Sequence, residues 1–137
     1  MVVNLVGVVA AAIASFIIGA IWYGPLFGRK WMSLMGWGKM KKGDIDKMKK
    51  SAGKGYATGF IGFLVLSYVL AYFLDVTQTT TIAAGMQIAF LAWLGFVATV
   101  TAGSVIWEGK SKDLYFLNNA YQLVSMLVMS AILVYLM

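Results

Sequence analysis

The chain contains no cysteine and no histidine. The absence of cysteine excludes disulfides and thiolate chemistry, and the absence of histidine excludes imidazole ligands and histidine acid–base catalysis. Only five of the 137 residues are acidic, and no motif joins a nucleophile to a base or forms a glycine-rich phosphate loop. We therefore expect no catalytic residue, no metal site and no cofactor, and we do not expect the protein to be an enzyme.

Charge of either sign is also scarce. Charged residues make up 12% of the chain and hydrophobic residues 61%, whereas about 25% of a soluble domain is charged. Apolar runs of roughly 20 residues match a hydrocarbon core about 30 Å thick, and none of the runs here has the polar face that a soluble helix would need. The sequence predicts an all-α polytopic membrane protein with one transmembrane domain, residues 1–137. Its bundle of four transmembrane helices is expected at residues 2–24, 56–75, 82–107 and 114–137.

The basic residues are concentrated in the connection at residues 29–54. That connection holds nine of the eleven basic residues and two aspartates, a net charge of +7, and the shorter turn after residue 107 adds Lys110 and Lys112. Four spans place both connections on one side, and the positive-inside rule assigns that side to the cytoplasm. We therefore predict a multi-pass cell-membrane protein with both termini outside and the 29–54 loop cytoplasmic. The lysines are expected to bind anionic membrane lipid, and no nucleic acid partner is expected.

The stretch IWYGPLFGRKW, residues 21–31, marks the border between the first span and the basic loop. Pro25 lacks an N–H and disfavours helix at the residue before it, so the span should end near this point. Aromatic side chains are enriched at membrane interfaces, which makes Trp22, Tyr23, Trp31 and Trp37 candidate interface anchors. Two interpretations stay open for the stretch: a gate for a partner or substrate, and a span terminator with anchors.

Small residues recur at every fourth position of the first span. Such a stripe lets two helix backbones approach closely in lipid. The predicted helix-packing residues are Gly7, Ala11, Ser15 and Gly19. Spans two and three carry small faces as well, and the protomer is small, so we expect a homo-oligomer. The sequence does not tell which small faces pack within a protomer and which pack between protomers.

Spans three and four contain uncharged polar residues but no acid or base at depth. The missing buried carboxylate argues against proton-coupled transport. Facing lipid, the amides and hydroxyls would lose water without compensation, so they should point inward. They form a predicted polar pathway: Gln87, Trp93, Thr101, Ser104, Asn118, Gln122 and Ser125. We expect Thr101 and Ser104 to be the partners of Asn118 and Gln122. The alternative is that these groups only form hydrogen bonds between helices.

The two halves of the chain show a weak internal similarity. IWYG at 21–24 matches IWEG at 106–109, and residues 63–74 align with residues 126–137 at five identical positions. These matches indicate a duplicated helical hairpin, as found in membrane proteins built from repeats. The alternative is chance matching within a small hydrophobic alphabet.

Three segments together resemble a family of small prokaryotic four-helix membrane proteins, catalogued as domain of unknown function seventeen-sixty-one. They are GAIWYGPLFGRKWM (19–32), WLGFVATVTAGSVIWEGKS (93–111) and NNAYQLVSMLVMSAIL (118–133). The most specific motif is W-Y-x-P-L-F-G-x-x-W, matched by Trp22, Tyr23, Pro25, Leu26, Phe27, Gly28 and Trp31. The resemblance implies a four-helix integral membrane protein and carries over no activity.

Two functional hypotheses follow from these features. The first is a small oligomeric transporter or channel-like protein for an unknown small solute, with its polar pathway in spans three and four. The second is a membrane scaffold that does not transport and acts through lipid or partner contacts of its basic loop. A polar cavity beside Asn118 and Gln122 would favour the first hypothesis, and a closed bundle the second.

Overall fold

The structure of the protein is a computed structural model that describes residues 3–36 and 42–137, and it contains helices and no strand within those residues. Four helical stretches are long and apolar enough to cross a membrane. They are Leu5–Leu26, Ala52–Val76, Ile82–Ile106 and Lys112–Tyr135. The predicted fold class, an all-α bundle of four transmembrane helices, is confirmed.

Two of these four stretches are divided into shorter elements. The helices in chain order are α1 (Leu5–Ile21), η1 (Trp22–Leu26), α2 (Gly28–Leu34), α3 (Lys42–Val76), α4 (Ile82–Ala92), η3 (Trp93–Ala98), α5 (Thr99–Thr101), α6 (Gly103–Ile106) and α7 (Lys112–Tyr135). The segments η1 and η3 are π-helical. The first span is thus α1 with η1, and the third is α4, η3, α5 and α6.

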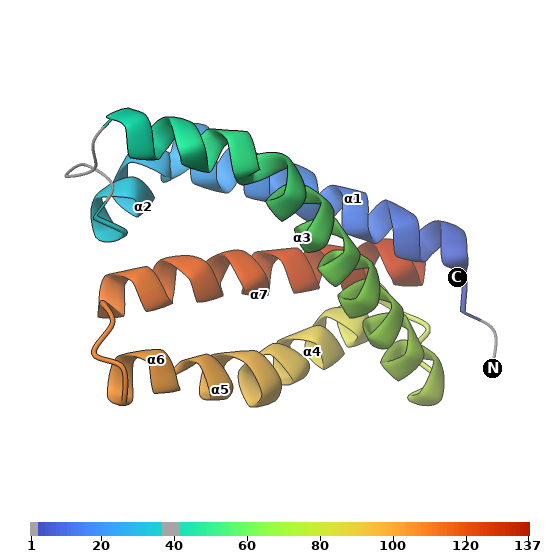
Figure 1. Cartoon of the computed structure of the whole chain (residues 1–137). Helices are drawn as coiled ribbons and strands as arrows, with labels where there is room; N and C mark the ends of the chain where they lie inside the picture. Colours follow the sequence, from blue (N-terminus) through green and yellow to red (C-terminus); the bar gives the residue numbers. More distant parts are fainter. Residues whose placement is uncertain (1–2, 37–41) are drawn as a thin grey trace.

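Helix α7 is the centre of the bundle (Figure 1). It packs against α1 on one side and against α4 on the other, and α3 packs mainly against α1. Figure 1 shows α3 following α1 and then crossing toward α4 near its C-terminal end. As a result, α3 makes much smaller contacts with α7 and α4 than with α1.

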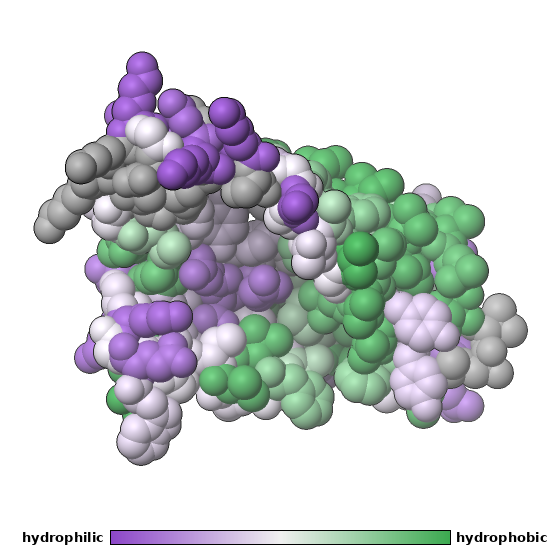
Figure 2. Space-filling view, in the orientation of Figure 1, coloured by the Kyte–Doolittle hydropathy of each residue, from purple (hydrophilic) through white to green (hydrophobic). Residues whose placement is uncertain are grey.

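The two ends of the bundle differ in character. At one end, the Asn4 side chain accepts from the N–H groups of Val6 and Gly7, and its Nδ2 donates to the Leu136 carbonyl (2.6 Å), which joins the two termini. We call this the terminal end. The other end, called the basic end, carries α2, the start of α3 and the turn before α7, and its surface is hydrophilic (Figure 2).

Most of the predicted basic loop is helical. Residues 28–34 form α2, and α3 begins at Lys42, ten residues before the span that it contains. Lysine, methionine and alanine are good helix formers, and no proline interrupts residues 42–76, so the helix continues beyond the membrane. The predicted anchor Trp37 lies outside the described residues.

The small-residue stripe of α1 lies against α7. Ala11 and Ser15 are fully buried. A Cβ added at Gly7 would lie 3.5 Å from a Leu133 methyl group, and one added at Gly19 would lie 2.8 Å from the Tyr121 hydroxyl. The stripe therefore brings the backbones of α1 and α7 close together, which larger side chains would prevent.

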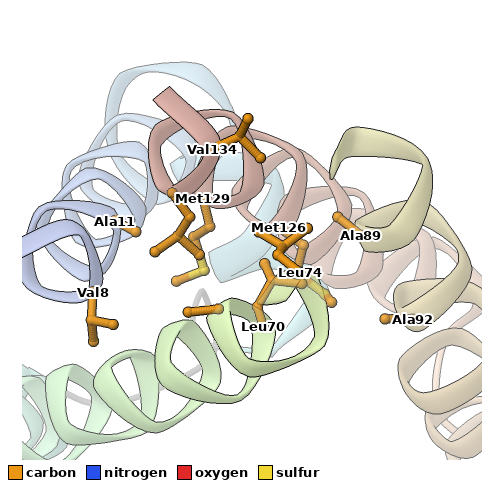
Figure 3. Packing of buried hydrophobic residues seen from close by; sticks show 11 residues of the cluster. Val8, Ala11, Leu70, Leu74, Ala89, Ala92, Met126, Met129 and Val134 are labelled. Carbon is orange, nitrogen blue, oxygen red and sulfur yellow. The ribbon is translucent and has the colours of Figure 1, made fainter. Parts of the chain in front are cut away.

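The apolar core lies where α3, α4 and α7 converge. Figure 3 shows Leu70 and Leu74 of α3 beside Met126 and Met129 of α7, with Ala89 of α4 near them. Leu74, Met129 and Ala89 are fully buried, and Leu70 and Met126 are nearly so. This core closes the bundle toward the terminal end.

The proposed duplication stays a prediction. The aligned pairs Ser67/Ser130 and Leu70/Leu133 are all buried, as a repeat requires. The aligned tryptophans differ, because Trp22 lies half-buried in η1 whereas Trp107 is 85% exposed beyond α6.

The predicted membrane orientation has a direct test. Because the chain has no native cysteine, single cysteines at Ser33, exposed on α2, and at Ser51 report only on the basic end. We expect impermeant maleimides to label both only after cells are permeabilised, since that end should be cytoplasmic. A cysteine at Thr80, exposed at the terminal end, should be labelled in intact cells. The reverse pattern would show that the orientation is wrong.

Candidate functional site

The first span ends in a π-helical turn, η1. The Phe27 N–H donates to the Trp22 carbonyl five residues back (2.9 Å), and Pro25 within the turn has no N–H to donate. The wider π turn therefore fits the chain around a proline that would break an α-helix. Such π turns occur often at functional sites.

The third span contains a second π-helical segment, η3, near its middle. A shift to five-residue hydrogen bonds leaves backbone carbonyls without their usual partner, which is costly inside a membrane. Three hydroxyl groups donate to carbonyls of this segment: Thr99 to Gly95 (2.7 Å), Thr101 to Val97 (2.7 Å) and Tyr115 to Ala98 (2.6 Å). The threonines of span three and Tyr115 of α7 thus stabilise an interrupted helix.

The two π-helical segments attach to the same turn of α7. The Trp22 indole N–H donates to the Leu117 carbonyl (3.2 Å) and the Trp93 indole N–H donates to the Asn119 carbonyl (2.9 Å). Each tryptophan is the first residue of its π-helical segment. The first and third spans therefore hold α7 at one level, from two sides.

Side chains of α7 complete this polar layer. The Tyr23 hydroxyl donates to Asn118 Oδ1 (2.7 Å), and the Thr101 hydroxyl lies 2.9 Å from Asn119 Oδ1. Asn119 is 6% exposed, and its Nδ2 donates to the Tyr115 carbonyl (2.8 Å). The predicted pairing of Thr101 with Asn118 is wrong. Consecutive residues of a helix point about 100° apart, so Asn118 faces η1 and its neighbour faces the third span.

A cleft lies between the start of α3 and α7 at the basic end. Gly55, Gly59 and Gly62 follow one another at helical spacing on α3, and a Cβ added at any of them would meet no atom within 4 Å. Figure 2 shows a hollow between the hydrophilic start of α3 and α7, with hydrophilic surface at its floor. The absence of side chains at these three positions leaves the space beside α3 open.

Helical spacing places Gln122 on the side of α7 that faces the cleft. It precedes Met126 and Met129 by one and two helical turns, so it shares the face of α7 that packs against α3 nearer the terminal end. Its side chain is partly exposed and, within residues 3–36 and 42–137, makes no hydrogen bond. An amide at this position is therefore available to a ligand.

An apolar groove of about 360 Å³ lies next to the cleft on the side of the terminal end. Its walls come from α3, from the third span and from α7. The lining residues are Leu66, Val69, Leu70, Phe73, Ala92, Phe96, Val97 and Met126. Because Leu66 is one turn beyond Gly62 and Met126 one turn beyond Gln122, the groove begins where the polar part of the cleft ends.

The motif at the end of span one is a single folding unit. The Trp22 ring lies 4.8 Å from the Phe27 ring, and the Tyr23 ring lies 5.4 Å from the Trp31 ring, measured between centroids. Gly28 is buried, and a Cβ added to it would lie 2.7 Å from the Tyr23 carbonyl oxygen. The motif residues therefore fold the turn and attach it to α7. Trp22 and Tyr23 direct their N–H and O–H groups to α7, not to the membrane surface as an interface anchor would.

The sequence of residues 6–134 matches the model of one family, described as a protein of unknown function (DUF1761). The chain belongs to this family. No curated protein and no solved structure was found to match the chain.

In this family member, the remaining predicted pathway residues lie apart from the cleft. Gln87 is exposed on the outside of α4, and the Ser104 hydroxyl donates to the Thr101 carbonyl of its own helix (2.8 Å). Ser125 is fully buried in α7, and its hydroxyl has no hydrogen-bond partner among the described residues. Of the predicted set, Trp93, Thr101 and Asn118 form the polar layer, and helical spacing directs Gln122 toward the cleft.

Tyr115 and Asn119 also belong to the polar layer, and the sequence did not predict them. Both lie on α7, and each makes a hydrogen bond with the third span. They also bond each other, because Asn119 Nδ2 donates to the Tyr115 carbonyl. The adjacent asparagines Asn118 and Asn119 were a signal for them, because two neighbouring amides on one helix imply two different partner helices.

Proposed function

We propose that the protein is a membrane carrier for a small uncharged solute that binds in the cleft between α3, η3 and α7. The observation that carries this proposal is the Gln122 amide, which is partly exposed inside a membrane span and has no hydrogen-bond partner among the described residues. An amide inside a membrane span that makes no hydrogen bond is costly. A solute that bonds the amide offsets that cost, which gives the position a function in binding.

The shape of the cleft supports a carrier more than a channel. The cleft opens at the basic end, and the core around Leu74 and Met129 closes it toward the terminal end. An open pore would need a continuous polar path, whereas a carrier exposes its site to one side at a time. The cleft corresponds to a carrier open toward the basic end.

The chemistry of the cleft supports an uncharged solute. The described residues assigned to its walls and floor are glycines, apolar side chains and Gln122, and none of these is charged. A charged solute would enter a membrane span without a counter-ion, at a cost of several kcal/mol. Hydrogen bonding to one amide is sufficient for a neutral polar group.

The interrupted helices provide a means of movement. Helices bend most readily where π turns or prolines interrupt their hydrogen bonds, and carriers often place such breaks beside the binding site. Here η1 and η3 flank the same turn of α7. We propose that α7 and the parts of spans one and three beyond these segments tilt together to open the terminal end.

A second function is supported by the lysines of α3. Lys47, Lys50 and Lys54 lie on the same face as the exposed residues Ile61 and Tyr68, at intervals of three, four and seven. This face continues from lipid-exposed side chains to exposed ammonium groups, which suits contact with anionic headgroups. We propose that this face of α3 binds anionic lipid around the protein. In a protein that carries no solute, the same contact would support the function of a membrane scaffold.

Accessibility of a cysteine at Gln122 tests the carrier proposal. We expect Gln122→Cys to react with an impermeant maleimide from the basic side, and more slowly from the opposite side of oriented vesicles, because a carrier opens both ways. Gln87→Cys is the matched control. It faces outward on α4, so it should react from neither side, since maleimides need a hydrated thiolate.

Each negative outcome has a separate meaning. Reaction from the basic side alone would exclude a carrier and would be compatible with a binding site or a scaffold. No reaction from either side would show that the cleft is closed and would remove the basis of the proposal.

A further inference from the structure

We infer that the solute is an uncharged amphiphile that enters the cleft from the lipid, with its polar group at Gln122 and its hydrocarbon body in the apolar groove. This inference rests on the proposed function and names its substrate class. It is carried by the depth of the amide, by the change from polar to apolar along the cleft, and by the absence of charge among the described lining residues.

The depth of Gln122 and the lack of charge among the assigned lining residues disfavour a charged head. The amide lies ten residues after Lys112, the first residue of α7, which is about 15 Å along an α-helix. That is about half of a hydrocarbon core roughly 30 Å thick. A phospholipid whose phosphate reached Gln122 would bring its charge deep into a membrane span where the assigned lining residues offer no cationic partner, which is unfavourable. A neutral head reaches the same depth at much lower cost.

The groove fits a hydrocarbon body in the same orientation. From Gln122 one turn of α7 leads to Met126, and from Gly62 one turn of α3 leads to Leu66, and both of these residues line the groove. A molecule with its polar end at the amide therefore extends into apolar surroundings. The groove passes between α3 and η3, whose facing residues include the exposed Phe96 and Val69. Lipid therefore has access from the side.

The amide also defines the polar group. A glutamine side chain offers one carbonyl acceptor and one NH₂ donor. It pairs with a hydroxyl, which donates and accepts, or with a carbonyl, which accepts alone. Long-chain alcohols and ketone- or quinone-type lipids share this chemistry, and separate probes distinguish them.

Photolabelling of the full chain in phosphatidylcholine nanodiscs tests the inference. Three probes carry the same long alkyl chain with a diazirine at mid-chain, and end in a hydroxyl, a ketone or a permanently ionised sulfonate. We expect the hydroxyl probe, the ketone probe or both to label residues 66–73 and 92–97. Excess unlabelled compound of the same class should compete for that labelling. The sulfonate probe should label these segments about tenfold less, the equivalent of about 1.4 kcal/mol.

Two variants and two controls locate the site. Gln122→Leu should lower the competed labelling about tenfold by removing the hydrogen bonds, and Gly62→Leu should lower it by filling the cleft without a clash. Gln87→Leu removes an exposed amide away from the cleft, and Gly53→Leu adds the same bulk at another open glycine. Both controls should label like the wild type.

Equal labelling by the sulfonate probe, or labelling that Gln122→Leu leaves unchanged, would overturn the inference. Uniform labelling of all lipid-facing segments would mean that the groove holds bulk lipid only, which also overturns it. If Gln122→Cys still reacts from both sides in the accessibility experiment, the carrier proposal survives and the amphiphile alone is wrong.

Discussion

Replacing Gly28 by alanine should destabilise the protein by about 3 kcal/mol, the upper end of the usual cost of overpacking. The added methyl group would lie 2.7 Å from the Tyr23 carbonyl oxygen, a backbone atom that no rotamer change moves away. Relief requires η1 to shift, and η1 carries Trp22 and Tyr23, which bond α7 at Leu117 and Asn118. The clash therefore strains several contacts together.

The neighbouring glycine of the same motif is the control. An added Cβ at Gly24 would meet no atom within 4 Å, so Gly24→Ala should leave the thermal midpoint in detergent nearly unchanged. Gly28→Ala should lower that midpoint by several degrees and increase the exposure of the aromatic cluster, seen as a red shift of tryptophan emission. If the two variants melted together, the close approach at Gly28 would be refuted.

The sequence predicted the spans well because length and apolarity alone determine them. A run of about 20 apolar residues has few ways to fold in a bilayer other than as a helix. The stretch after residue 28 was harder to predict. Its lysines indicated a loop by charge, yet their helix propensity and the lack of proline let α3 begin at Lys42. Charge reports on which side of a membrane a segment lies, and much less on its secondary structure.

The candidate site was predictable in part. The spacing of Asn118 and Gln122 predicted two amides one turn apart on the same helix, and both lie on α7. The need to satisfy polar groups in lipid predicted that Asn118 is bonded, and it is. The partner of Asn118 was missed, because it is Tyr23 at the end of the first span. Helical spacing gives the direction of a side chain relative to its own helix, but not which neighbouring helix lies in that direction.

The two π-helical segments were not predicted at all. A π turn depends on how a helix fits its neighbours, and the hydroxyls that satisfy its carbonyls look in sequence like ordinary threonines and tyrosines. At η1 the signal was present, since Pro25 inside an apolar run must interrupt the α-helix. At η3 the residues WLGFVA contain no such marker. The layer formed by η1, η3 and α7 therefore follows from tertiary packing.

The second large effect is expected at Ala11, in the stripe where α1 meets α7. Ala11 is 0% exposed and packs in the core cluster with Val8 and Met129. Ala11→Leu adds three carbon atoms where no space exists, so the helices must separate, at a cost of about 1–3 kcal/mol. Separation would also lengthen the hydrogen bond from the Tyr121 hydroxyl to the Ser15 carbonyl, now 2.8 Å.

The same substitution on the opposite face isolates this effect. Ala20 is exposed on α1, so Ala20→Leu adds the same three carbons toward lipid and should change the thermal midpoint in detergent little. Ala11→Leu should lower the midpoint by several degrees. Because α1 holds η1 against α7, Ala11→Leu should also loosen the bundle near the cleft. In the double variant Ala11→Leu/Gln122→Cys, the thiol should therefore react faster with maleimide than in Gln122→Cys alone. Unchanged stability of Ala11→Leu would mean that α1 and α7 do not touch along this stripe. The arrangement of the bundle, with the cleft that depends on it, would then be wrong.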